Sequence, residues 1–127
     1  MTGPLLMDES DFHKRVDTIL AIVESAMDNT ESDIDAELNG GVLSLTFENG
    51  SKIIINRQTP NREIWVAAKS GGFHFRHDEN RASVAPEACS PPQKLTAWRN
   101  TRTSESLADL LTRVVTDQAG EVVNFTD

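Results

Sequence analysis

Eight carboxylates and one histidine are the side chains in this sequence that are best placed to do chemistry. The carboxylates all fall between Val16 and Ser51, a stretch without Lys or Arg: Asp17, Glu24, Asp28, Glu31, Asp33, Asp35, Glu37 and Glu48. The chain has 20 acidic residues, 12 basic residues and a net charge of -8, so this stretch carries the whole imbalance. Carboxylates that no base neutralises attract positive charge, which predicts either a metal cation or a basic protein surface as the partner.

The first predicted helix places three of these carboxylates in one row. Its apolar residues recur at helical spacing and define a buried stripe: Phe12, Val16, Ile19, Leu20, Val23 and Met27. At about 100° per residue, Asp17, Glu24 and Asp28 lie within about 40° of one another and beside that stripe. His13 lies one turn before Asp17, on the same side. The row is therefore expected at the seam between the helix and the sheet.

The next segment predicts a strand with acids on one face. Residues 33–38 alternate acidic and apolar side chains, which places Asp33, Asp35 and Glu37 on the same side, with Glu31 in the connector. If helix and strand are neighbours, the two rows form one acidic ridge, which we define as His13, Asp17, Glu24, Asp28, Glu31, Asp33, Asp35 and Glu37. Oxygen ligands with one imidazole suit Ca²⁺, Mg²⁺, Mn²⁺ or Fe²⁺. No EF-hand loop is present, so we expect weak, open, multisite binding; a solvated acidic face without a ligand is the alternative.

The remaining pattern predicts a meander of strands followed by a second helix. We expect strands at 42–47, 52–58, 63–68 and 73–76, with a short one at 95–99, separated by Gly- and Pro-containing turns. The second helix should start near Thr103 or Ser104 and end before Gly120, and 122–125 should pack on the core. The fold class is therefore α+β, a two-layer sandwich with both helices on one sheet face. Residues 1–127 form a single domain with a loose tail at 1–7 and a surface loop at 78–94.

The sheet face away from the helices offers a second candidate site. If Ile53 and Ile55 point inward, Asn56 and Gln58 point outward, and by the same alternation Trp65 is outward. A solvent-facing tryptophan beside amides is typical of a protein-binding site. The pattern equally allows Trp65 to pack under the long loop.

Composition excludes several classes of function. The net charge of -8 argues against nucleic-acid binding, and no apolar run approaches the length of a membrane span. The N-terminus lacks the pattern of a signal peptide, which predicts a cytoplasmic protein. The lone Cys89 excludes an internal disulfide and a multi-cysteine metal centre. No Glu-x-x-His pair, nucleophile–base pair or phosphate-binding loop is present, so we do not expect an enzyme.

Three segments are distinctive: Asn39-Gly40-Gly41-Val42-Leu43, Asn56-Arg57-Gln58-Thr59-Pro60-Asn61 and Ile64-Trp65-Val66-Ala67. They resemble the signature of the frataxin family, and the opening Ser10-Asp11-Phe12-His13 and the late Gln118-Ala119-Gly120-Glu121 resemble its bacterial CyaY type. The resemblance implies a helix–sheet–helix sandwich and an iron-binding accessory protein of iron–sulfur cluster assembly, acting as a regulator or an iron donor.

The resemblance also implies roles for particular residues. Iron (Fe²⁺ or Fe³⁺) and the cysteine desulfurase are expected at Glu24, Asp28, Asp33, Asp35 and Glu37, with Asp17, Glu31 and His13 as further members. Contacts to the assembly partners, including the scaffold protein, are expected at Asn56, Gln58 and Trp65. The protein would be a monomer or an iron-dependent oligomer. The alternative function is a metal-independent acidic module that binds a basic partner.

Overall fold

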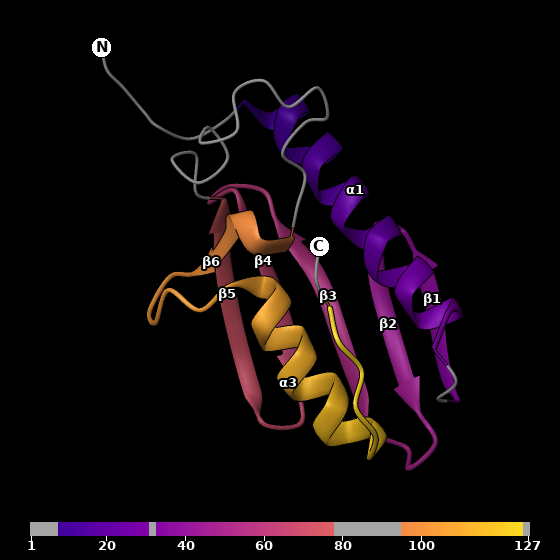
Figure 1. Cartoon of the computed structure of the whole chain (residues 1–127). Coiled ribbons are helices and arrows are strands. Elements are labelled where there is room, and N and C mark those ends of the chain that lie inside the picture. Colours follow the sequence, from indigo (N-terminus) through magenta and orange to yellow (C-terminus); the bar gives the residue numbers. More distant parts are fainter. Residues whose placement is uncertain (1–7, 31–32, 78–94, 126–127) are drawn as a thin grey trace, which may run out of the picture.

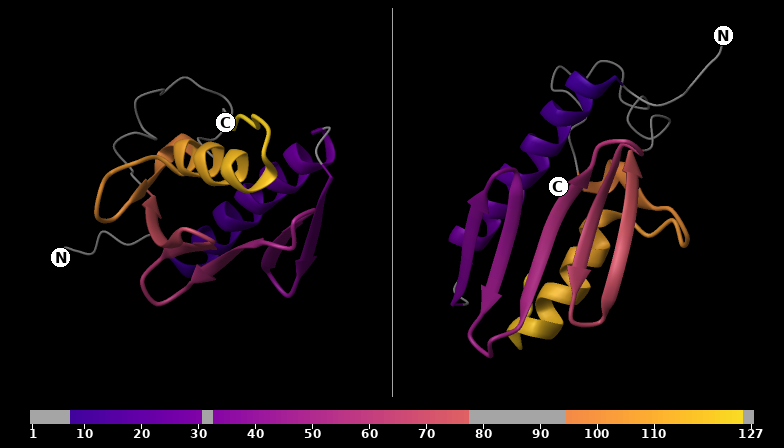
Figure 2. Two further views of the ribbon diagram at one scale, coloured as in Figure 1. Left: turned by 90° about the horizontal axis from the view of Figure 1, so that it is seen from below. Right: turned by 180° about the vertical axis from the view of Figure 1, so that it is seen from behind.

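Two helices cover one face of a six-stranded antiparallel sheet in this computed structural model, which describes residues 8–30, 33–77 and 95–125 (Figure 1). The strands lie side by side in chain order, from β1 to β6. Seen from behind, the sheet lies in front of both helices (Figure 2). The predicted α+β two-layer sandwich is therefore confirmed. The predictions for the tail at 1–7, Glu31, the loop at 78–94 and Cys89 lie outside the described residues.

The first helix, α1 (Glu9–Asp28), begins directly after its N-cap residue, Asp8, whose backbone is still extended. The Asp8 side chain accepts a hydrogen bond from the Ser10 amide at 3.1 Å, which satisfies one of the free amides of the first turn. The buried residues are the six of the predicted apolar stripe: Phe12, Val16, Ile19, Leu20, Val23 and Met27. Burial of this stripe fixes the rotation of the helix, and with it the direction of the acidic row.

The strands agree closely with the predicted pattern, apart from their ends. They are β1 (Ile34–Asn39), β2 (Val42–Phe47), β3 (Lys52–Gln58), β4 (Glu63–Ala68), β5 (Gly71–His77) and β6 (Trp98–Asn100). The fifth strand is longer than predicted because Gly71 and Gly72 pair with Ala68 and Ala67 of the preceding strand. The short strand predicted at 95–99 is instead a 3₁₀ turn, η1 (Leu95–Ala97), that leads into β6.

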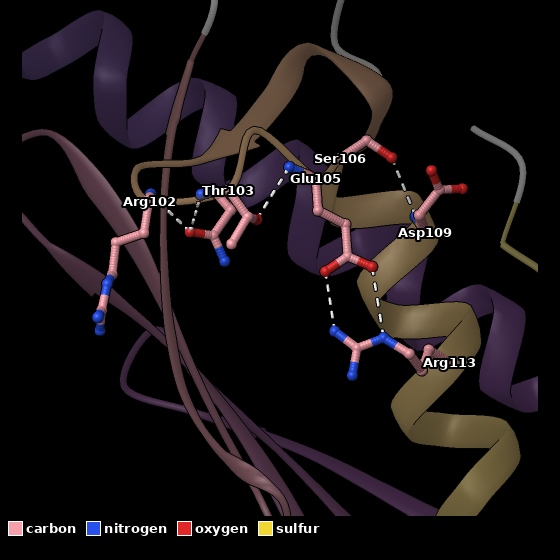
Figure 3. Close-up of polar contacts among 7 residues, drawn as sticks. Arg102, Thr103, Glu105, Ser106, Asp109 and Arg113 are labelled. Atoms are coloured by element: carbon pink, nitrogen blue, oxygen red, sulfur yellow. Dashed lines mark hydrogen bonds and ion pairs between the residues drawn. The ribbon is translucent and has the colours of Figure 1, made fainter.

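The second helix, α3 (Leu107–Ala119), starts later than predicted, because polar side chains hold the preceding segment in a turn. The Asn100 side chain accepts hydrogen bonds from the amides of Arg102 and Thr103, at 2.8 and 3.2 Å. The Ser106 hydroxyl then caps the helix by accepting from the Asp109 amide at 3.0 Å (Figure 3). Local side-chain bonds therefore outcompete helix formation at the predicted start.

The core lies between the helices and the inner face of the sheet. Its largest fully buried side chains include Trp98, Phe12 and Phe75. At the C-terminus Val123 and Phe125 are buried as predicted, whereas Val122 is 74% exposed and does not pack on the core. Among the described residues, neither helix has the length and apolar character that a membrane crossing requires.

Candidate functional site

The acidic residues of the second predicted row lie on an edge of the sheet. β1 is paired on one side only, and α1 packs near it. Within this strand Ile34 and Ala36 pack against the core, whereas Asp35 and Glu37 are exposed on the opposite face. The strand carboxylates therefore point away from the helices, and Asp33 is exposed just before the strand begins.

The acidic row of α1 faces the same edge of the sheet from the helix layer. Asp17 contacts Arg57 on β3, and Arg15, on the other flank of the helix, contacts His77 at the end of β5. Since β3 lies nearer to β1 than β5 does, the Asp17 flank is the one turned toward the β1 edge. Glu24 is half-buried and Asp28 is exposed on this flank. The acidic ridge is thus two rows that lie on either side of the β1 edge, rather than one continuous face.

Most of the ridge is electrostatically unbalanced. Within the described residues, none of the five central carboxylates forms an ion pair: Glu24, Asp28, Asp33, Asp35 and Glu37. No group of three or more His, Cys, Asp or Glu side chains among the described residues is close enough to hold a metal ion. This geometry suits cations that are held by one or two carboxylates together with water, rather than a closed cage.

Arg57 neutralises the N-terminal part of the ridge. The sequence did not predict this contact, because Arg57 lies 40 positions from Asp17 along the chain. Its Nη2 donates to Asp17 Oδ1 at 2.7 Å and its Nη1 donates to His13 Nδ1 at 2.8 Å. The Nε2 of the His13 ring lies 3.5 Å from Glu9. The guanidinium packs closely against Gly41, which has a φ of +82°. A Cβ atom at this position would lie only 3.3 Å from Arg57 Nη2, so glycine suits both the backbone conformation and the close contact. The Nδ1 of His13 therefore already has a protein partner, whereas its Nε2 lies beside the exposed Glu9 carboxylate.

Replacement of Arg57 by methionine is expected to lower the free energy of unfolding by about 1–2 kcal/mol, because two charge-assisted hydrogen bonds are lost. The arginine side chain is 15% exposed, whereas that of Asp17 is 68% exposed. Asp17→Asn should therefore change stability by only about 0.5 kcal/mol, as for an exposed ion pair. Urea unfolding of both variants measures the difference. Equal effects would show that Arg57 contributes only through the Asp17 ion pair.

The open sheet face carries the second set of predicted residues. Asn56 of β3 lies opposite Trp65 of β4, which in turn lies opposite His74 of β5. Trp65 is 36% exposed, so the prediction that it points away from the core is confirmed. Gln58 lies one row further along, opposite Glu63.

The sequence analysis missed three residues of this face. Glu63 and His74 contact Trp65, and Arg76 pairs with Glu63. The signal that could have identified them is their outward parity on neighbouring strands.

The fold and these two surfaces define a class: a small two-layer sandwich with an acidic edge and an aromatic, polar open sheet face. The sequence matches the frataxin-like domain over residues 5–121. The chain therefore belongs to the frataxin-like domain family, and the resemblance seen in the sequence is confirmed.

Solved structures agree with this assignment. Frataxin from Psychromonas ingrahamii, of the CyaY family, is 28% identical, with a TM-score of 0.77 over 95% of this chain and 100% of its own. Trimeric frataxin from the yeast Saccharomyces cerevisiae is 25% identical, with a TM-score of 0.57 over 95% of this chain and 87% of that one. A second structure of the trimeric yeast protein, complexed with ferrous iron, has the same identity and TM-score and covers 94% of that chain.

Proposed function

We propose that this protein is a non-enzymatic, iron-binding accessory protein of iron–sulfur cluster assembly in the cytoplasm. In this proposal the acidic ridge holds iron ions weakly and docks on a basic surface of the cysteine desulfurase. The open sheet face, with Asn56, Gln58 and Trp65, contacts the assembly partners, including the scaffold protein. The protein supplies iron or regulates cluster synthesis, and assays of cluster synthesis at several iron concentrations distinguish these two roles.

The observation that carries this proposal is the run of unpaired carboxylates along the β1 edge in a chain of the frataxin-like family. A relative of this chain has been solved with ferrous iron, which supports iron as the cation. Glu24, Asp28, Asp33, Asp35 and Glu37 are the proposed iron ligands. Asp17 and His13 would join them only if Arg57 releases them, and Glu31 is proposed on the sequence resemblance alone.

Titration of the labelled protein with Fe²⁺, followed by backbone NMR, tests the iron site. We expect signals of residues 24–28 and 33–37 to broaden or shift first, because exposed carboxylates bind hard and borderline cations. Signals near Arg57 should respond later. Sharp ridge signals combined with changes elsewhere would refute the assignment, and parallel titrations with Mn²⁺ and Ca²⁺ measure selectivity. Sedimentation of the same samples shows whether iron drives oligomerisation.

The alternative function, a metal-independent acidic module for a basic partner, rests on the same unpaired charges. It predicts that the affinity for the desulfurase falls with salt but does not change when iron is added or chelated. Cluster synthesis assayed with and without this protein, over a range of iron concentrations, then separates an iron donor, an inhibitor and a bystander.

A further inference from the structure

A carboxylate is buried on the open sheet face, where side chains usually meet water. Glu63 shares its parity on β4 with the exposed residues Trp65 and Ala67, yet it is only 7% exposed. Burial of a carboxylate is costly unless hydrogen bonds and opposite charge compensate it. The neighbours of Glu63 on this face therefore indicate its role.

Those neighbours use both oxygens of the carboxylate. Arg76 Nη2 donates to Glu63 Oε2 at 3.1 Å, from the residue directly opposite on β5. Trp65 Nε1 donates to Glu63 Oε1 at 3.0 Å. His74 Nδ1 lies 3.8 Å from the same oxygen. One buried carboxylate thus connects three side chains of the face into a single cradle.

The cradle fixes the indole of Trp65 at two points. The ring stacks on His74, with centroids 4.3 Å apart and planes inclined by 7°, and its Nε1 is tied to Glu63. Nε1 is the one hydrogen-bond donor of an indole. Since this donor is used within the protein, Trp65 presents only apolar surface to a partner. A side chain that is already ordered also loses less entropy when a partner binds.

The surface beside this indole is a shallow hollow of mostly apolar character. It measures about 200 Å³, and its lining includes the outward residues Ile54, Trp65 and Ala67, with Asn56 and His74 as polar members. Among the described residues the charge beside it is positive, because Arg76 and Arg99 lie opposite each other on β5 and β6, and the ion pair of this row joins Arg76 to Glu63. Such a site suits an apolar side chain that is followed or preceded by a carboxylate.

We propose that Glu63 is a positioning residue, and that the face it organises receives an apolar side chain next to an acidic residue on a partner protein. The contact to Trp65 is then made through the ring and not through its N–H group. The existence of a partner at this face rests on the proposed function, whereas the cradle rests on the geometry alone.

Indole N–H exchange, measured by NMR on the full chain, tests the cradle without a partner. Glu63→Ala removes the acceptor, so the Trp65 indole proton should exchange about tenfold faster, as expected for one lost hydrogen bond. Glu63→Gln keeps an acceptor oxygen and should restore slow exchange. Trp98 is 0% exposed and serves as the internal control for folding. Unchanged exchange of Trp65 in Glu63→Ala, with Trp98 unaffected, would overturn the cradle.

Binding to the purified desulfurase–scaffold assembly tests the mode of recognition. Trp65→Phe keeps an apolar ring and should stay within about threefold of the wild-type affinity, whereas Trp65→Ala should lose more than about tenfold. Arg99→Gln, outside the cradle, should weaken binding about threefold at low salt and not at high salt. Equal losses of affinity for Trp65→Phe and Trp65→Ala would show that the partner binds the N–H group of the indole, and would overturn the proposal.

The two proposals fail in different ways. If replacements at Trp65 and Arg99 leave the affinity unchanged while charge reversal on the acidic ridge removes it, the inference about the sheet face is wrong, and of the proposed function only the role of the acidic ridge stands. If the wild-type protein does not bind the assembly at all, the proposed function fails and the docking half of this inference falls with it. The exchange of the Trp65 indole proton still decides the cradle in that case.

Discussion

Replacement of both Asp33 and Asp35 by lysine is expected to weaken binding to the cysteine desulfurase by about 100-fold at low ionic strength. Both carboxylates are exposed at the β1 edge, and neither pairs with another described residue. Reversal turns attraction into repulsion at the centre of the proposed interface and also removes electrostatic steering, so the association rate should fall with the affinity. Titration of the desulfurase at low and high salt measures the effect, which screening should reduce.

A matched reversal on the other helix shows whether position or net charge decides this result. Asp109→Lys with Asp117→Lys changes the net charge equally on exposed positions of α3. Asp109 lies in the first turn of α3, so about 0.5–1 kcal/mol of stability is lost there, which thermal unfolding monitors. We expect this control to bind within about threefold of the wild type. Equal losses in the two variants would contradict a docking site at the ridge, as would an unchanged affinity for the ridge variant.

The fold could be predicted in most of its parts because its signals are local. The apolar stripe of α1 and the alternation in β2, β3 and β4 identify the buried side of each element, since burial follows the helical and strand periods. The same alternation in β1 fixes the direction of its acidic side chains. If Ile34 and Ala36 face the core, Asp35 and Glu37 must face away from the helices, so the ridge wraps around an edge.

The contacts that organise the two surfaces could not be predicted in the same way. Arg57 reaches Asp17 across 40 positions in the chain, and nothing in the local pattern of either residue indicates the partner. Glu63 has the parity of an outward residue of β4, and its burial depends on the β4–β5 register that places Arg76 opposite it. The register between two strands is set by the geometry of the turn and by the packing of the whole sheet. The residue pattern within one strand does not specify it.

The acids of β1 also have a structural consequence. An edge strand with unpaired amides and carbonyls invites pairing with another chain, and charged side chains on such a strand oppose it. Asp35 and Glu37 are therefore expected to oppose pairing of the β1 edge with another strand, whatever they bind. Loss of ridge charge is expected to favour self-association as well as to weaken cation binding, so the oligomeric state must be measured in every ridge variant.

Replacement of Gln118 by leucine is expected to lower the free energy of unfolding by about 3 kcal/mol, because buried polar groups would lose their partners. Gln118 is 4% exposed near the end of α3. Its Oε1 accepts from the Lys69 amide at 2.9 Å, and its Nε2 donates to the Ser51 hydroxyl at 3.0 Å and to the Lys52 carbonyl at 3.3 Å. One side chain thus joins the helix to the β2–β3 and β4–β5 turns, and leucine can satisfy none of these groups.

The neighbouring position provides the control for this prediction. Asp117→Leu introduces the same side chain on the exposed side of α3 and should change stability by about 0.5 kcal/mol or less. Urea unfolding of both variants, with hydrogen exchange at the Lys69 amide, measures the result. Exchange at Lys69 should accelerate only in Gln118→Leu, since that amide loses its acceptor there. A similar stability for both variants would mean that water replaces the lost bonds, and that packing of α3 on the sheet, rather than Gln118, holds the two turns.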